Sequence, residues 1–144
     1  MTAVLTLGQI DPSGAATTKE AAIKEAADLL VRAEAVTSTY YQAMLAREAT
    51  ISTFMGNLLA IPHGTNDATR EIRFSALSFV RYAQPIDWDG HEVRFVMGIA
   101  GINNVHIEML SKIALLFSEN DEVQKLLDAP DAQTLYHLLS GINS

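Results

Sequence analysis

Residues 74–100 read FSALSFVRYAQPIDWDGHEVRFVMGIA, and this stretch decides the fold. Two runs inside it, Phe74 to Val80 and Val93 to Ala100, are apolar on both faces of an extended chain. That pattern is typical of strands covered on both sides by helices. Between them, Trp88-Asp89-Gly90 supplies a hairpin-type turn. The stretch therefore predicts two neighbouring strands inside a layered fold.

Two helical patterns precede these strands. The first begins near Thr17, because Thr17 and Glu20 have the spacing of a capping box. It continues in an apolar stripe of Ile23, Ala26, Ala27 and Leu30. The second covers roughly Thr39 to Glu48 and is expected to turn Tyr41, Met44 and Leu45 inward.

The rest of the chain adds one short strand and three helices. Leu58 to Ile61 is a short apolar run halted by Pro62, which indicates a strand edge opening into a tight turn. Asn104 is expected to cap a helix that ends near Phe117, and shorter helices are expected to start near Ser118 and Asp131. Because helices both precede and follow the strands, the predicted fold class is α/β in three layers.

The composition excludes several classes of protein. The chain has 144 residues, a net charge of -7 and no cysteine. Its length fits one domain over residues 1–144, and the lack of cysteine excludes thiol chemistry and disulfides. The acidic balance argues against nucleic-acid binding. With no apolar run near the roughly 20 residues of a membrane span and no signal peptide, we expect a soluble cytoplasmic protein without direct membrane insertion.

His63 is the first of two candidates for chemistry among the four histidines. Pro62 stiffens the chain before it, and Gly64 lets the backbone approach whatever the imidazole binds. Thr65 is expected to cap a short helix over residues 66–71, whose N-terminus would attract an anion and keep the ring neutral and nucleophilic. The local pattern is equally consistent with a polar turn histidine that has no chemical role.

His106 is the second candidate, because it lies in the first turn of a predicted helix, where a cation is poorly placed unless an anion is near. A helix-start histidine in contact with water explains it as well. His91 and His137 are expected at the surface. Arg47 suits either a cap on helix-end carbonyls or a clamp on phosphate.

The common catalytic and metal motifs are missing or incomplete. The histidines are scattered singly, unlike the close pair of a zinc site. Gly98-x-x-Gly101 is followed by no Gly-Lys-Ser/Thr, so it is not a P-loop. A Ser-His-Asp triad stays possible by composition, although the chain has no G-x-S-x-G elbow. We expect no metal and no cofactor.

Four motifs, in this order and spacing, resemble the IIA component of the bacterial phosphoenolpyruvate-dependent sugar phosphotransferase system. They are TKEAAI at 18–23, YQAMLARE at 41–48, AIPHGT at 60–65 and GIAGINNVHI at 98–107. The similarity runs nearly end to end and is greatest with the mannitol type of the fructose-mannitol family. The resemblance implies a mixed β-sheet flanked by helices on both faces.

It also implies a function and its residues. One phosphorylated histidine of the family matches His63, a second active-site histidine matches His106, and an active-site arginine matches Arg47. The family accepts phosphate from the carrier protein HPr and passes it to a sugar-specific IIB domain. Here that domain is expected in a separate membrane-associated permease (IIBC). The sugar is expected to be a hexitol, mannitol before any other, and fructose stays open after these. We expect phosphorylation at Nε2, with a hydrogen bond holding Nδ1.

Three further residues are candidates for the phosphate site. N–H groups around Gly64 and Thr65 would contact the phosphate oxygens. Asn57 occupies a position where mannitol-type members can carry a glutamate, in a Gly-Glu pair that here reads Gly56-Asn57. An amide can orient an imidazole or a water but supplies no negative charge.

Two other functions remain open from the sequence. The first is a regulatory phosphohistidine protein of the nitrogen-related IIA type, in which phosphorylated His63 signals to a target instead of feeding transport. The second is a small-molecule binding module without covalent chemistry. The transport carrier and the regulatory protein both acquire acid-labile phosphate, whereas the binding module does not.

Overall fold

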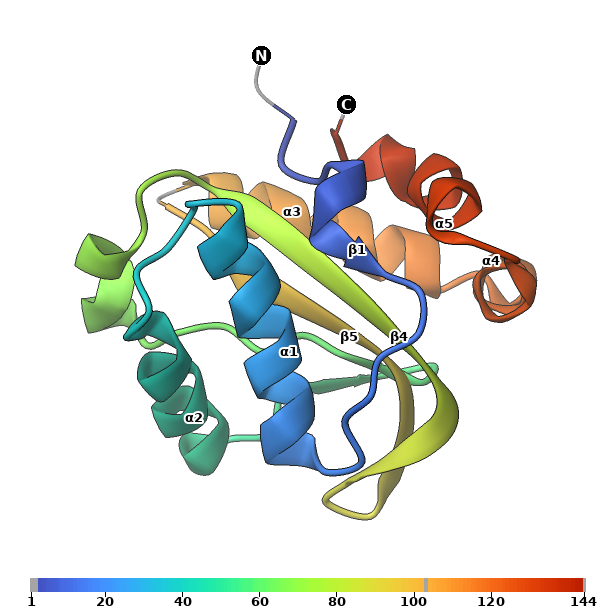
Figure 1. Cartoon of the computed structure of the whole chain (residues 1–144), viewed down its shortest axis with the longest axis horizontal. Coiled ribbons are helices and arrows are strands. Elements are labelled where there is room, and N and C mark those ends of the chain that lie inside the picture. The colour runs from blue at the N-terminus through green and yellow to red at the C-terminus, as the bar shows by residue number, and fades with distance from the viewer. Residues whose placement is uncertain (1–2, 103, 144) are drawn as a thin grey trace.

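The structure, a computed structural model, describes residues 3–102 and 104–143. A mixed sheet lies between two layers of helices, which confirms the predicted three-layer α/β class (Figure 1). The strand order is β1-β4-β5-β3-β2; β1 is parallel to β4 and β3 to β5, and the other neighbours are antiparallel. The strands are β1 Ile10–Asp11, β2 Phe54–Gly56, β3 Leu59–Ala60, β4 Ala76–Trp88 and β5 His91–Ala100.

The central hairpin of β4 and β5 forms as predicted, with Asp89 and Gly90 at positive φ in the turn. Successive residues point to opposite faces. Leu77 and Phe79 pack in one apolar cluster, whereas Ala76 and Val80 pack in the other. The strand β4 is longer than predicted. The pairing register shifts between residues 81 and 86, around a proline, and this irregularity broke the sequence pattern.

The first helical layer consists of α1 (Lys19–Arg32) and α2 (Tyr40–Thr50). The predicted stripe of α1 is buried, but the predicted cap was wrong by one residue. The Thr18 side chain, not that of Thr17, accepts a hydrogen bond from the Ala21 N–H at 3.2 Å.

The buried face of α2 also differs from the prediction. Tyr40, Met44 and Glu48 are the buried residues, while Tyr41 and Leu45 are half-buried beside them. Positions four apart lie one above another on a helix. The predicted face was therefore rotated by one residue, and it left out a carboxylate.

The second helical layer covers the opposite face of the sheet with α3 (Asn104–Phe117), α4 (Asn120–Asp128) and α5 (Ala132–Leu139). The Asp131 carboxylate caps α5 by accepting the Thr134 N–H at 2.8 Å. The helix α4 begins two residues later than predicted. The capping role predicted for the Asn104 side chain lies outside what the structure describes. No helix among the described residues is long and apolar enough to cross a membrane.

The two ends of the described chain are joined by one amide side chain. Asn143 Oδ1 accepts the N–H groups of Val4 and Leu5, each at 2.9 Å. Asn143 Nδ2 donates to the Leu5 carbonyl, also at 2.9 Å. The N-terminal segment is thereby fixed against the last turn of the chain.

Candidate active site

His63 lies just past the end of β3, next to a proline that interrupts the strand pairing with β5. Ile99 on β5 donates its N–H to the Pro62 carbonyl at 2.9 Å. Because Pro62 has no N–H to donate to the ladder, the pairing continues beyond it only as an isolated parallel bridge between His63 and Ile99. The His63 side chain is consequently half-buried at the sheet edge and not enclosed in the core.

The His63 ring is held by a hydrogen bond from Nδ1 to the carbonyl oxygen of Ile61, 2.8 Å away. A carbonyl can only accept, so Nδ1 carries the proton and Nε2 carries the lone pair. The geometry agrees with the tautomer expected from the sequence. Nε2 is the nitrogen available as a nucleophile.

His106 comes to the same place from the first turn of α3. The His63 and His106 rings meet in a T-shaped arrangement with centroids 5.2 Å apart and planes at 63°. The close approach depends on Gly101, since a Cβ there would lie 2.6 Å from the Cβ of His106. Two distant motifs of the sequence thus converge on one pair of imidazoles.

Both rings are held in the neutral state. The pKa of His63 is lowered from its ordinary 6.5, mainly by burial and also by the charge of Arg47. The hydrogen bond to Ile61 and the charge of Glu48 act in the opposite direction but do not outweigh burial. Burial and then His63 lower the pKa of His106. A neutral imidazole keeps its lone pair at physiological pH, which a nucleophile requires.

The two histidines face a cavity of about 400 Å³ at the junction of α2, β3, β5 and α3. Its described lining includes all but one of the residues predicted for the site: Arg47, His63, Gly64, Thr65 and His106. Tyr40, Thr69, Ile72, Gly101 and Ile107 complete this lining. Among these described lining residues Arg47 is positively charged and no side chain is acidic, so the cavity suits a dianion.

Arg47 combines the two roles that the sequence left open. Its guanidinium donates to the Ile51 carbonyl at 2.7 Å, which satisfies the end of α2. The same side chain lines the histidine cavity and acts electrostatically on His63. A guanidinium has five N–H donors, so this single bond leaves donors for an anion.

Tyr40 is a site residue that the sequence reasoning missed. Its hydroxyl donates to the Ile99 carbonyl at 2.8 Å and accepts the Gly64 N–H at 2.9 Å. Burial raises the pKa of Tyr40, so the hydroxyl keeps the proton that it donates. A Cβ on Gly64 would lie 2.6 Å from the Tyr40 ring, which explains the glycine.

This contact changes the role predicted for Gly64. Its N–H is already used by Tyr40 and positions the turn, so it is not a free donor for phosphate. Thr65 does precede a short helix, the 3₁₀ helix Asn66–Glu71, but its hydroxyl bonds Asp67 at 2.5 Å and does not cap that helix. Within the described part of the chain, the Thr65 N–H has no acceptor.

Asn57 is the one predicted site residue that the structure does not bring to the cavity. Its Nδ2 donates to the Phe117 carbonyl at 2.5 Å, at the end of α3. Five residues lie between Asn57 and His63, and Asn57 lines a separate pocket with Phe117 and Ser118. The Asn57 amide closes a helix end, and the structure shows no contact between Asn57 and the described lining of the cavity.

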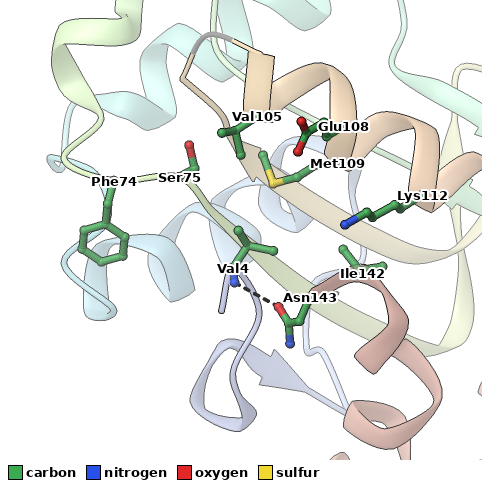
Figure 2. A pocket seen from close by; sticks show the side chains of 9 residues that line it. All are labelled: Val4, Phe74, Ser75, Val105, Glu108, Met109, Lys112, Ile142 and Asn143. Carbon is green, nitrogen blue, oxygen red and sulfur yellow. Dashed lines mark hydrogen bonds between the residues drawn. The ribbon is translucent and has the colours of Figure 1, made fainter. Parts of the chain in front are cut away.

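A larger cavity, of about 620 Å³, lies elsewhere (Figure 2). Side chains of α3, of the two residues before β4 and of both ends of the described chain surround it, among them Phe74, Met109 and Ile142. Its described lining contains no histidine and no arginine. Size alone does not identify the reactive site, since the paired imidazoles face the smaller cavity.

Comparisons with known proteins identify the family of this chain. Residues 3–141 match the model of the family described as phosphoenolpyruvate-dependent sugar phosphotransferase system, EIIA 2. The chain is 43% identical over 140 residues to the mannitol-specific phosphotransferase enzyme IIA component of Halalkalibacterium halodurans, covering 97% of each chain.

Two solved structures from Escherichia coli are also similar, each at 30% identity. One is enzyme IIAMTL in complex with phosphorylated enzyme IIBMTL, with a TM-score of 0.88 over 95% of this chain and 97% of that one. The other is the crystal structure of IIA mannitol, with a TM-score of 0.86 over 94% and 98%. This chain therefore belongs to the EIIA 2 family of the sugar phosphotransferase system, with the mannitol type as its near relatives.

Proposed function

We propose that this protein is the IIA phosphocarrier of a mannitol transport system. It accepts a phosphoryl group from phosphorylated HPr on His63 Nε2 and passes it to a IIB domain. The observation that carries the proposal is the geometry of His63: an imidazole with its proton fixed on Nδ1, half-exposed in a cavity whose described lining has a cation and no carboxylate. The names of the relatives support mannitol as the sugar, and the IIA–IIB complex supports the acceptor.

The transfer step uses groups already in place. The Nε2 lone pair of His63 forms a bond to phosphorus as the donor's phosphorus–nitrogen bond breaks, and that electron pair returns to the donor imidazole. No proton has to leave Nε2, because this tautomer carries none there. Positive charge develops on the ring, and the Nδ1–H bond to the Ile61 carbonyl stabilises it. The second transfer, to IIB, reverses these steps with the IIB nucleophile attacking.

The charge of the phosphoryl oxygens is met by Arg47, by a ring N–H of His106 and by the Thr65 N–H. Stabilisation by such preorganised donors is the main contribution that a protein makes to phosphoryl transfer. HPr as donor follows from the family resemblance. The neutral histidines suit phosphoryl transfer, because a neutral ring binds no tightly paired anion that the incoming phosphoryl group would have to displace.

The test is phosphorylation of the purified chain by phosphoenolpyruvate, enzyme I and HPr. Wild type should acquire one acid-labile phosphohistidine, detected by 31P NMR and mass spectrometry. His63→Ala should acquire none and keep its thermal unfolding transition, and His137→Ala, an exposed histidine on α5, should behave as wild type. Normal phosphorylation of His63→Ala would contradict the assignment.

A second stage separates transport from regulation. Addition of a mannitol IIB domain should discharge the phosphorylated chain, as expected for a carrier. A stable phosphoprotein in the presence of IIB would favour the regulatory, nitrogen-related function. Absence of phosphate on the wild-type chain would favour a binding module.

A further inference from the structure

Glu48 is a buried carboxylate next to the site, and the chemistry described above does not use it. It is the third buried position of α2, and its side chain is only 3% exposed. Its Oε2 accepts the Thr53 N–H and the Trp88 Nε1–H, both at 3.0 Å. Its Oε1 bonds the Thr53 hydroxyl at 2.5 Å. An acid is costly to bury unless its oxygens are satisfied and its charge is paired. Here three hydrogen-bond donors converge on Glu48, and the Lys19 ammonium lies 3.7 Å from Oε2.

A continuous series of hydrogen bonds leads from Glu48 to the reactive ring. Glu48 fixes both the backbone N–H and the side chain of Thr53. The Thr53 carbonyl then accepts the Ile61 N–H at 3.0 Å. The carbonyl of the same Ile61 holds His63 Nδ1 at 2.8 Å. The orientation of that carbonyl, and with it the tautomer of the ring, depends on where Thr53 is held.

The anchoring is independent of the strand ladder on the other side. Toward β5, the turn is held by Ile99 through Pro62, and toward α2 it is held by Tyr40. The segment from Thr53 to Ile61 carries only short strands, and a left-handed turn at residues 56–58 separates them. A short irregular segment keeps one conformation only when side-chain bonds fix it. The buried carboxylate supplies such bonds.

We propose that Glu48 is a positioning residue for phosphoryl transfer, acting through Thr53 and the Ile61 carbonyl to hold His63 with Nδ1 protonated and Nε2 free. The inference rests on the proposed function, but its first readout does not require phosphate. The negative charge of Glu48 has a separate, electrostatic effect: it raises the pKa of His63, which burial and Arg47 lower.

The test compares three variants. Glu48→Ala removes the anchor. Glu48→Gln is the conservative rescue, because one amide oxygen can accept from Trp88 and the Thr53 N–H while the NH₂ donates to the Thr53 hydroxyl. Trp88→Phe is the matched control: it removes a donor from the same carboxylate and leaves the Thr53 bonds intact.

The first readout is the tautomer of His63, from 15N NMR of the ring in the unphosphorylated protein. The second is steady-state transfer from phosphorylated HPr. Glu48→Ala should lose the single Nδ1–H tautomer and about tenfold in kcat, with KM for HPr unchanged, as expected for a misplaced nucleophile. Glu48→Gln should recover the tautomer and most of kcat. Trp88→Phe should lower Tm and leave both readouts as in wild type.

Two results would overturn the proposal: a folded Glu48→Ala with the wild-type tautomer and kcat, or losses of kcat that merely follow Tm in Glu48→Ala and Trp88→Phe alike. If Glu48→Ala does not fold, Thr53→Val removes one of the two bonds that hold Thr53 and keeps the Thr53 N–H bond. It should lose part of the single tautomer and part of kcat, and wild-type values of both would contradict the inference. A wild-type chain that accepts no phosphate contradicts the proposed function alone, because the ring spectra still report on positioning.

Discussion

The rings of His63 and His106 meet edge to face, with centroids 5.2 Å apart. At this distance a proton on one ring disfavours a proton on the other. The pair therefore stays neutral while the cavity is empty, and a dianion on His63 reverses the preference of its neighbour. A phosphoryl group should draw a proton onto His106, which then acts as a charged donor.

His106→Ala should slow phosphoryl transfer without abolishing it. Loss of one donor to the phosphoryl oxygens should lower kcat by roughly 10- to 1000-fold, the range for a preorganised donor, while His63 stays competent. Rapid-quench measurement of transfer from phosphorylated HPr checks this, with His91→Ala, an exposed histidine at the start of β5, as the control. A transfer rate equal to that of wild type would remove His106 from the site.

The free energy of unfolding should decrease in mild acid because of His63 and His106. Burial is the main cause that lowers the pKa of each histidine in the fold below 6.5. Below about pH 6.5 the unfolded chain binds protons that the folded chain refuses, so the free energy of unfolding decreases as the pH falls through the folded pKa values.

Urea unfolding between pH 7.5 and 5 measures this slope. The double variant His63→Ala/His106→Ala should show a shallower decrease than wild type, since it lacks both groups. Parallel curves for the two proteins would mean that other groups cause the acid sensitivity.

Tyr40→Phe should destabilise the fold and loosen the turn at His63. The change removes the hydroxyl that links Gly64 to Ile99 and leaves a buried carbonyl and N–H without that partner. We expect a loss of about 1–3 kcal/mol in the free energy of unfolding, and a lower transfer rate. The neighbouring variant Tyr41→Phe removes an exposed hydrogen bond of 3.3 Å and should change stability little. Equal stability of the two variants would contradict the linking role.

Asn57→Ala should reduce stability and leave phosphoryl transfer unchanged. The residue has φ of +49°, and its amide closes the end of α3 through Phe117. Alanine loses the hydrogen bond and tolerates the left-handed conformation poorly, for about 1–3 kcal/mol together. Asn57→Gly tolerates the left-handed backbone and loses only the side-chain hydrogen bond, so it measures the contribution of that bond to stability. A drop in transfer rate as large as that of His106→Ala would return Asn57 to the phosphate site.

The sequence predicted the layers of this fold because its hydrophobic patterns are long and regular. The stripe of α1 and the two central strands were recognisable, and the hairpin turn at Asp89-Gly90 has the residues that such a turn requires. The short strands β1 and β2 were not predicted, since two or three residues carry no readable period. Their existence depends on partners far along the chain, such as the pairing of Ile10 with Phe79.

The site was predicted in the same uneven way. His63, His106 and Arg47 line one cavity, and their convergence followed from the family motifs, not from local pattern. Tyr40 and Glu48 were missed because the α2 face was placed one residue out of phase, which hid both polar groups. With the buried face of α2 placed correctly, the sequence would have shown Glu48, a carboxylate four residues after Met44, on that buried face.

The amide of Asn143 bonds Val4 and Leu5, which lie 139 and 138 positions earlier in the sequence, and so joins the two ends of the described chain. The two ends of the described chain lie side by side, so the domain can be inserted into a surface loop of a host protein through two adjacent junctions. A circular permutant that joins these ends by a short linker should keep its strand order, because the linker then holds the ends together as the Asn143 side chain does here.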